Sequence, residues 1–281
     1  MPALDLASVY FSPTWSTQTT IRMMAKGMGA VAREYDITPA IHPFKETTDL
    51  SESGLVVFAS PVYCGRIPQV AVRRMKRFVG RDTPAVVVAV YGNRNYDDSL
   101  AELQDLAMEN GFRVIAAAAC VAQHTYASTV APGRPDPEDW LRLENFGAQV
   151  EGKLEAFNPS WTENVKIKGK RPYCDPIRLT PCTPTTIDSC TLCGTCAWHC
   201  PAAAIPFDTP NVTLADACIS CGRCIKVCPD RSRRFHPESL RSVIHFLETS
   251  AADKRQNEFF LELDDFKISV IIKSYTVFRR K

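Results

Sequence analysis

Short apolar runs alternate with longer amphipathic segments through the first 157 residues of the chain. The runs LDLASVYFS (4–12), GLVVFASP (54–61), PAVVVAVYG (84–92) and FRVIAAAACVA (112–122) are rich in β-branched or small apolar residues. Nearly continuous apolar runs of this length are typical of strands buried on both faces of a parallel sheet. A further strand, EYDITP (34–39), is predicted on a weaker pattern.

Segments with helical periodicity separate these strands. Ile21, Met24, Met28 and Val31 recur at helical spacing within residues 19–34, and similar segments follow at 68–80, 97–111 and 136–157. Alternating strands and helices imply right-handed crossovers between parallel strands. We therefore predict a doubly wound α/β domain over residues 1–157.

The pattern changes after residue 157. Residues 158–185 contain five prolines and the basic stretch VKIKGKRP, and are predicted to be a linker or irregular arm. Residues 186–236 are too few for a conventional core, so we expect this small α+β unit to be held together by what its cysteines bind. The extension 237–281 is predicted to contain one or two amphipathic helices within 237–263, and a tail, 266–281, that forms an edge strand or docked segment.

Composition and charge narrow the classes of function. With 45% hydrophobic and 23% charged residues, the chain has the balance of a globular protein. The net charge is +2, divided as about −3 over residues 1–157 and +5 over 158–281, which argues against a nucleic-acid binder. No apolar run reaches the roughly 18 residues of a membrane span, and the opening MPALDLASVYF lacks the order of a signal peptide. We expect a cytoplasmic protein.

Eight of the twelve cysteines form two copies of one spacing, CTLCGTCAWHCP (190–201) and CISCGRCIKVCP (218–229). In a reducing compartment, clustered thiols indicate metal binding rather than disulfides. Structural zinc is the alternative, but zinc sites use paired C-x2-C knuckles and need no third cysteine at this spacing.

The two copies resemble the bacterial two-cluster ferredoxin family over about 50 residues, including Gly194, Gly222 and both closing prolines. In that family the fourth cysteine of each run ligates the other cluster. The resemblance implies two 4Fe-4S clusters, one held by Cys190, Cys193, Cys196 and Cys228, the other by Cys218, Cys221, Cys224 and Cys200.

Three loops of the first domain follow predicted strands, at the sheet edge where such folds bind ligands. They are SPTWSTQT (12–19), SPVYCGRIP (60–68) and YGNRNYDDSL (91–100). The first offers hydroxyls, backbone N–H groups and a helix N-terminus without any Lys or Arg. Such a loop suits a phosphate dianion, or an ordinary helix cap.

The order of these loops resembles the flavodoxin family. The resemblance implies a flavodoxin-like sheet of order 2-1-3-4-5 that binds FMN, with the phosphate in residues 12–17 and the ring between the second and third loops. Tyr96 is expected to stack on the ring, with Tyr63 or Tyr91 opposite. The residues assigned to FMN are Ser12, Thr14, Trp15, Ser16, Thr17, Pro61, Val62, Tyr63, Gly65, Tyr91, Gly92, Asn93 and Tyr96.

The loops depart from the flavodoxin pattern at two places. Trp15 stands where the family often has glycine, and would be strained if its φ is positive. Arg66 and Arg94 stand where low-potential flavodoxins have acids, so we hypothesise a raised flavin potential and electron flow from the clusters to FMN.

As a whole the chain resembles flavodoxin/ferredoxin fusion proteins of anaerobic bacteria and archaea. This implies an electron carrier that passes single electrons between two 4Fe-4S clusters and FMN, and on to redox partner proteins in anaerobic metabolism. The alternatives are a flavin-dependent oxidoreductase that reduces a small molecule, and a sensor or scaffold with structural clusters. We assign no catalytic residue, although His124 lies where it could approach the ring edge. Without a GxGxxG fingerprint after a strand, a separate donor protein is expected rather than NAD(P)H.

Overall fold

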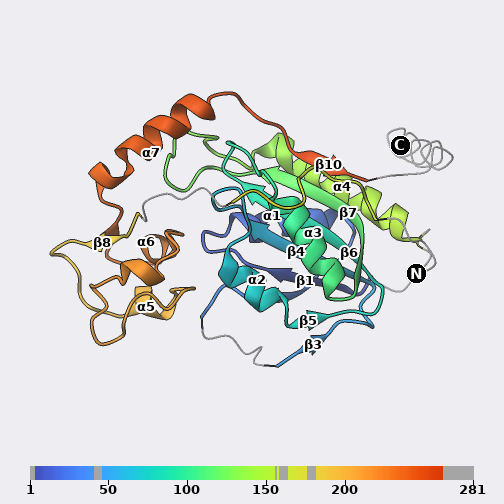
Figure 1. Cartoon of the computed structure of the whole chain (residues 1–281), viewed down its shortest axis with the longest axis horizontal. Coiled ribbons are helices and arrows are strands. Elements are labelled where there is room, and N and C mark those ends of the chain that lie inside the picture. The colour runs from blue at the N-terminus through green and yellow to red at the C-terminus, as the bar shows by residue number, and fades with distance from the viewer. Residues whose placement is uncertain (1–3, 41–45, 156, 158–163, 176–181, 262–281) are drawn as a thin grey trace, which may run out of the picture.

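The first 157 residues form a three-layer α/β unit in the computed structural model, which describes residues 4–40, 46–155, 157, 164–175 and 182–261 (Figure 1). Five parallel strands run in the order β2-β1-β4-β6-β7. This is the flavodoxin-like order 2-1-3-4-5, and it includes the weakly patterned second strand. The strands are β1 (Leu6–Tyr10), β2 (Arg33–Asp36), β4 (Leu55–Pro61), β6 (Thr83–Tyr91) and β7 (Phe112–Val121).

Helices cover both faces of this sheet. α1 (Ser16–Gly27) and α4 (Pro137–Glu155) pack on one face, and α2 (Gln69–Met75) and α3 (Ser99–Glu109) pack on the other. The central strands β4, β6 and β7 are therefore buried on both sides, as their continuous apolar runs predict. Each fully buried Val, Leu or Phe contributes roughly 1.5–3 kcal/mol to folding.

Two of the helices are shorter than predicted. α1 ends at Gly27 and Gly29 adopts a φ of +62°, which leaves Val31 exposed. α2 ends at Met75, and the chain continues into β5 (Phe78–Val79), which pairs with β3 (Thr48–Asp49).

The C-terminal extension adds a strand where the sequence predicted a helix. α7 (Pro237–Ser250) lies within the predicted helical segment, but the chain beyond it is extended and ends in β10 (Glu258–Phe260), antiparallel to β7. β10 places Phe259 against one apolar core and Phe260 against the other, which favours a strand over a helix. The predicted tail, 266–281, lies outside the described residues.

Residues 164–175 of the predicted linker run as an irregular arm along α3. The Asp98 carboxylate accepts hydrogen bonds of 2.7 Å from the backbone N–H groups of Lys170 and Cys174. The arm is therefore held by side chains of the first domain, without secondary structure of its own.

The cysteine-rich unit contains two short helices, α5 (Thr195–Trp198) and α6 (Arg223–Lys226), a 3-10 turn at Ala215–Ala217, and one antiparallel pair, β8 (Thr185–Thr186) with β9 (Arg233–Arg234). It lies beside the carboxyl ends of the parallel strands, and α7 leads from it back toward β10 (Figure 1). Arg74 of α2 donates a 2.6 Å hydrogen bond to the carbonyl of Pro201 in this unit. Across the described part of the chain, no helix has the length and apolarity needed to cross a bilayer.

Candidate functional site

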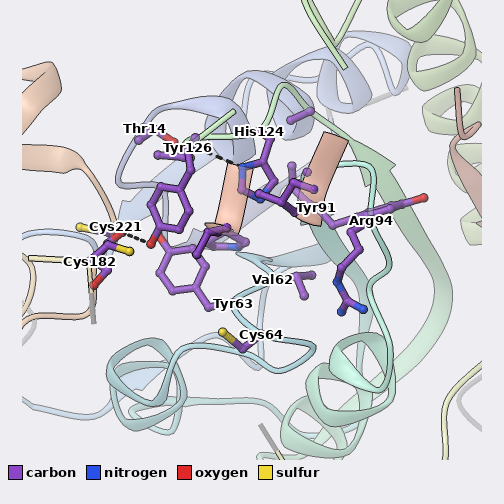
Figure 2. A pocket seen from close by; sticks show the side chains of 18 of the residues that line it. Thr14, Val62, Tyr63, Cys64, Tyr91, Arg94, His124, Tyr126, Cys182 and Cys221 are labelled. Atoms are coloured by element: carbon purple, nitrogen blue, oxygen red, sulfur yellow. Dashed lines mark hydrogen bonds between the residues drawn. The ribbon is translucent and has the colours of Figure 1, made fainter. Parts of the chain in front are cut away.

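A cavity of about 480 Å³ lies where the two units meet, a size within the range of small-ligand sites. Loops that follow β1, β4, β6 and β7 form one side of it, and the other side comes from residues 218–221 of the cysteine-rich unit and from α7 (Figure 2). The cavity therefore occupies the carboxyl edge of the sheet, where open α/β folds bind ligands.

All three predicted loops reach this cavity. Their contact with a flavin remains a prediction, but the fold brings to one place most of the residues that the sequence assigned to FMN. Those that line the cavity are Thr14, Ser16, Pro61, Val62, Tyr63, Gly65, Tyr91 and Gly92.

Tyr96 and Asn93 lie outside the cavity, contrary to expectation. The Tyr96 ring is 3% exposed and packs edge-on against Tyr91, and its hydroxyl donates a 3.0 Å hydrogen bond to the carboxylate of Glu258. The buried amide of Asn93 donates to the carbonyl of Ala251 at 2.8 Å. Both side chains anchor the extension that carries β10, whose position the sequence did not reveal.

The loop of residues 12–17 fits an anion. The backbone N–H of Ser12 donates to Thr38 at 2.7 Å and the Ser12 hydroxyl accepts from the N–H of Gln18 at 3.1 Å, so Ser12 supports the loop from within. The hydroxyl of Thr17 is buried without a partner among the described residues, and Trp15, the N-cap residue of α1, provides no side-chain cap. A phosphate would give these donors an acceptor.

Trp15 adopts a φ of +66°, the conformation that glycine tolerates best. A non-glycine residue in this region costs on the order of 1–3 kcal/mol. Its ring is 41% exposed and lies 4.8 Å from the guanidinium carbon of Arg223 in the cysteine-rich unit. Ser12, Trp15 and Thr17 do not line the cavity, but they frame Thr14 and Ser16, which do.

His124 lines the cavity as a neutral base. Burial, helped by the nearby positive Arg94, lowers the pKa of the imidazole to about 4. Its Nδ1 accepts a 3.1 Å hydrogen bond from the backbone N–H of Tyr126, so the ring proton lies on Nε2. A Cβ atom at Gly92 would lie 2.3 Å from the imidazole, so this close packing requires glycine.

The two arginines expected beside the ring lie in different surroundings. Arg66 binds Glu102 with two hydrogen bonds of 2.8 and 2.9 Å and lines a separate groove instead of the cavity. Arg94 does line the cavity, where its guanidinium pairs with Asp97. Arg66 therefore does not line the cavity, and the charge hypothesis now rests on Arg94 alone.

Tyr63 and Tyr126 extend from the sheet loops toward the cysteine-rich unit (Figure 2). The Tyr126 hydroxyl donates a 2.6 Å hydrogen bond to the carbonyl of Ser220. Burial raises the pKa of both phenols well above the ordinary value, so both stay neutral donors at physiological pH.

Several lining residues were missed by sequence reasoning. Tyr126 follows His124 in the segment QHTYAS, whose place at the end of a predicted strand was the available signal. Nothing local in the sequence indicated the others, which come from the end of the linker and from α7: Cys182, Ser242, Val243, Phe246 and Leu247.

Two small hollows in the cysteine-rich unit divide the eight cysteines into two sets. We call them the distal hollow, lined by Cys190, Cys193, Cys196 and Cys228, and the proximal hollow, lined by Cys200, Cys218, Cys221 and Cys224. Each set combines three cysteines of one copy with the fourth of the other. Among the described residues, no three Cys, His, Asp or Glu side chains converge on a single metal ion; these thiols surround a space instead. Soft thiolates so arranged fit an iron-sulfur cluster.

The proximal hollow adjoins the cavity. Cys218 and Cys221 line both spaces, whereas Cys193 of the distal hollow is exposed to solvent. The proximal hollow is therefore the one next to the cavity, and the distal hollow is the one with a cysteine at the surface.

Comparison with known proteins identifies the cysteine-rich unit. Residues 186–229 match the family described as the 4Fe-4S dicluster domain, so the chain carries a ferredoxin-type 4Fe-4S domain after its α/β domain. No curated protein matches the chain.

Similar solved structures align with roughly the first half of the chain. An archaeal flavodoxin has 12% identity and a TM-score of 0.39, covering 54% of this chain and 99% of its own. A WrbA-like flavodoxin from Agrobacterium tumefaciens has 15% identity and a TM-score of 0.38, covering 56% and 100%. The flavodiiron core of Flv1 from Synechocystis sp. PCC6803 has 18% identity and a TM-score of 0.40, covering 55% and 36%. At these low scores, the strand order alone carries the fold assignment.

Proposed function

We propose that the protein is an electron-transfer iron-sulfur flavoprotein that holds two 4Fe-4S clusters and one FMN, and passes single electrons between them and to partner proteins. The observation that carries this proposal is the shared wall: Cys218 and Cys221 line both the proximal hollow and the cavity. When bound, FMN accepts one or two electrons, whereas a cluster exchanges one at a time.

The chain's own residues have distinct roles in holding the flavin. Thr14, Ser16 and the start of α1 bind the phosphate, because they offer hydroxyls and backbone N–H groups. Val62 and Tyr91 surround the ring, and Tyr63 replaces Tyr96 as the candidate for stacking. The apolar residues Val243, Phe246 and Leu247 of α7 form part of the cavity wall.

The cysteine sets bind the clusters as the spacing predicts. The proximal set would hold a cluster beside the flavin site, and the distal set would hold one near the surface, within reach of a partner protein. Cys193 is exposed there, and Leu192 and Trp198 nearby are 57% and 58% exposed, which offers an apolar contact for such a partner. We retain the division into 1–157, 158–185, 186–236 and 237–281, with β10 joined to the sheet of the first domain.

A second candidate function is a flavin-dependent oxidoreductase that reduces a small acceptor with electrons from the clusters. His124 favours it, because a buried neutral imidazole in the cavity presents an Nε2–H donor. His124 would donate a hydrogen bond from Nε2–H to the acceptor and so orient it and stabilise the negative charge that it gains.

Anaerobic purification with iron, sulfide and FMN measured per chain tests the main proposal. We expect about eight irons, eight sulfides and one FMN. About four irons, or no flavin after incubation with FMN, would contradict it. If the loaded protein turns over small acceptors at a steady rate, and His124→Gln abolishes that turnover while the flavin is still reduced, the second candidate is preferred.

A further inference from the structure

Arg223 is a buried cation without a carboxylate partner. It lies on α6 between Cys221 and Cys224, yet its side chain points into the domain boundary and is only 8% exposed. In the described part of the chain no carboxylate lies within ion-pair distance of it, although Asp36 and Cys221 act on its charge from further away, and its Nε has no hydrogen-bond partner. An unpaired buried guanidinium is strongly unfavourable. An anion is therefore expected beside it.

The position of Arg223 indicates which anion. One terminal nitrogen donates a 3.0 Å hydrogen bond to the carbonyl of Pro13, and the guanidinium carbon lies 4.8 Å from the centre of the Trp15 ring. Both residues belong to the loop at 12–17, which contains no Lys or Arg. The other unpartnered buried donor of this loop is the hydroxyl of Thr17. Two buried donors without acceptors, the Nε of Arg223 and the hydroxyl of Thr17, are thus found at this one loop. They come from two different domains.

The contact with Arg223 gives a reason for a tryptophan at position 15. Its positive φ is a conformation that glycine would adopt without strain, so a large aromatic residue needs a compensating role. The indole face attracts the guanidinium and holds its plane against the loop. Tryptophan at this position therefore orients Arg223.

We propose that Arg223, from the iron-sulfur domain, binds the phosphate of FMN, and that Trp15 fixes its guanidinium at the loop of residues 12–17. This inference rests on the proposed function, because it requires FMN. The phosphate would accept from Arg223 and Thr17 and neutralise the buried charge. The flavin site is then complete only when the iron-sulfur domain is docked, so phosphate binding holds the two redox domains together.

Flavin titration of the full chain tests this inference. The protein is prepared anaerobically with its clusters and without flavin, and FMN and riboflavin, which lacks the phosphate, are titrated separately by flavin fluorescence. We expect Arg223→Gln to raise the Kd for FMN about 10- to 100-fold, as for a lost charged hydrogen bond, with the Kd for riboflavin unchanged. Lys226→Gln is the matched control: it removes the same charge from the exposed face of α6 and should change neither Kd.

Two further variants guard against a folding defect. Trp15→Gly relieves the backbone but removes the platform, and should raise the Kd for FMN about 3- to 10-fold. Arg223→Lys keeps the charge and should retain part of the preference for FMN over riboflavin. If Arg223→Gln loses iron, Trp15→Gly and Arg223→Lys are the variants that test the inference. If both prefer FMN over riboflavin as strongly as the wild type does, the inference is overturned.

The remaining outcomes separate this inference from the proposed function. If the wild type binds FMN but Arg223→Gln binds it equally well, or loses FMN and riboflavin to the same degree, Arg223 does not bind the phosphate and flavin binding stands. A shift in the reduction potential of the clusters, with FMN affinity unchanged, would identify the proximal cluster as the partner of Arg223 and also overturn it. If the wild type binds neither flavin, both proposals fail.

Discussion

The hydroxyl of Tyr126 donates a 2.6 Å hydrogen bond to the backbone carbonyl of Ser220. Tyr126 belongs to the loop after β7, and Ser220 lies between Cys218 and Cys221 of the proximal hollow. One side chain of the α/β domain is thus bonded directly to the cysteine loop that borders the cavity. Because this bond fixes that loop against the cavity, its loss should affect electron transfer more than folding.

Tyr126→Phe removes this hydrogen bond and keeps the ring. We expect a loss of about 1 kcal/mol in stability, the ordinary contribution of one hydrogen bond, with iron and flavin contents unchanged. Intramolecular electron transfer between cluster and flavin, followed after flash reduction, should slow several-fold. Tyr35→Phe is the control, because Tyr35 lies in β2 and does not line the cavity. An unaltered transfer rate in Tyr126→Phe would show that the bond does not position the cysteine loop.

The crossed division of cysteines makes a specific prediction. Cys228→Ser should disturb the distal cluster, although Cys228 lies in the second copy, and Cys200→Ser should disturb the proximal one. We expect each variant to lose up to about four irons or to show one altered cluster signal by electron paramagnetic resonance. Flavin should remain reducible through the proximal cluster in Cys228→Ser.

The control for this pair is Cys174→Ser, which changes an exposed cysteine outside both hollows. It should keep the full iron content. If Cys200→Ser instead altered the same cluster as Cys190→Ser, each copy would bind its own cluster and the crossed arrangement would be wrong.

The parallel sheet was predictable because strands buried on both faces need nearly continuous apolar runs, and β4, β6 and β7 have them. The cysteine sets were predictable because their spacing encodes the ligand loop. β10 was not, because three residues carrying Phe259 and Phe260 suit an amphipathic helix as well as a strand. Its pairing partner lies about 140 residues earlier in the chain.

Tyr96 and Tyr126 illustrate the same limit within the site. Both follow strands at the carboxyl edge of the sheet, so either position suits a cavity residue, but the sequence analysis assigned only Tyr96. Glu258 of β10 accepts a hydrogen bond from the Tyr96 hydroxyl, so the placement of β10 holds Tyr96 in the core. Tyr126 lines the cavity instead. Long-range packing decided between two locally equivalent tyrosines.

His124 should make stability depend on pH. Its pKa of about 4 in the folded chain lies below the value of about 6.5 in an unfolded chain, so the unfolded state binds more protons between these limits. The free energy of unfolding is therefore highest well above pH 6.5. It decreases as the pH falls toward 4, because only the unfolded chain then gains the proton on His124. Between pH 7.5 and 5.5, the flavin-free protein should lose about 1.4 kcal/mol more stability than His124→Gln.

Urea unfolding of the wild type and His124→Gln at both pH values measures this difference. His245→Gln serves as the control, because it makes the same substitution at an exposed site on α7. Equal pH dependence in the wild type and His124→Gln would mean that the buried imidazole does not remain neutral.

Asn257 pins the extension to the sheet. It is 3% exposed, its Oδ1 accepts a 2.8 Å hydrogen bond from the N–H of Val121 at the end of β7, and its Nδ2 donates to Asp139 at 3.1 Å. Asn257→Leu leaves the N–H of Val121 buried without an acceptor, whereas Asp139 keeps its hydrogen bonds from Arg134, so we expect a loss of about 1–3 kcal/mol. Hydrogen exchange at Val121 and along β10 should accelerate. Gln256→Leu is the matched control: its amide is exposed, and its loss should change stability by less than about 0.5 kcal/mol.

The same substitution tests whether β10 supports the cavity. The segment between α7 and β10 is held by Asn93 and Asn257, and α7 lines the cavity, so freeing β10 should let α7 move away from it. Flavin added to Asn257→Leu should then be more accessible to an external quencher than in Gln256→Leu. Equal quenching in both variants, with β10 exchange accelerated, would show that α7 keeps its place without the strand, and that the edge strand serves the stability of the sheet alone.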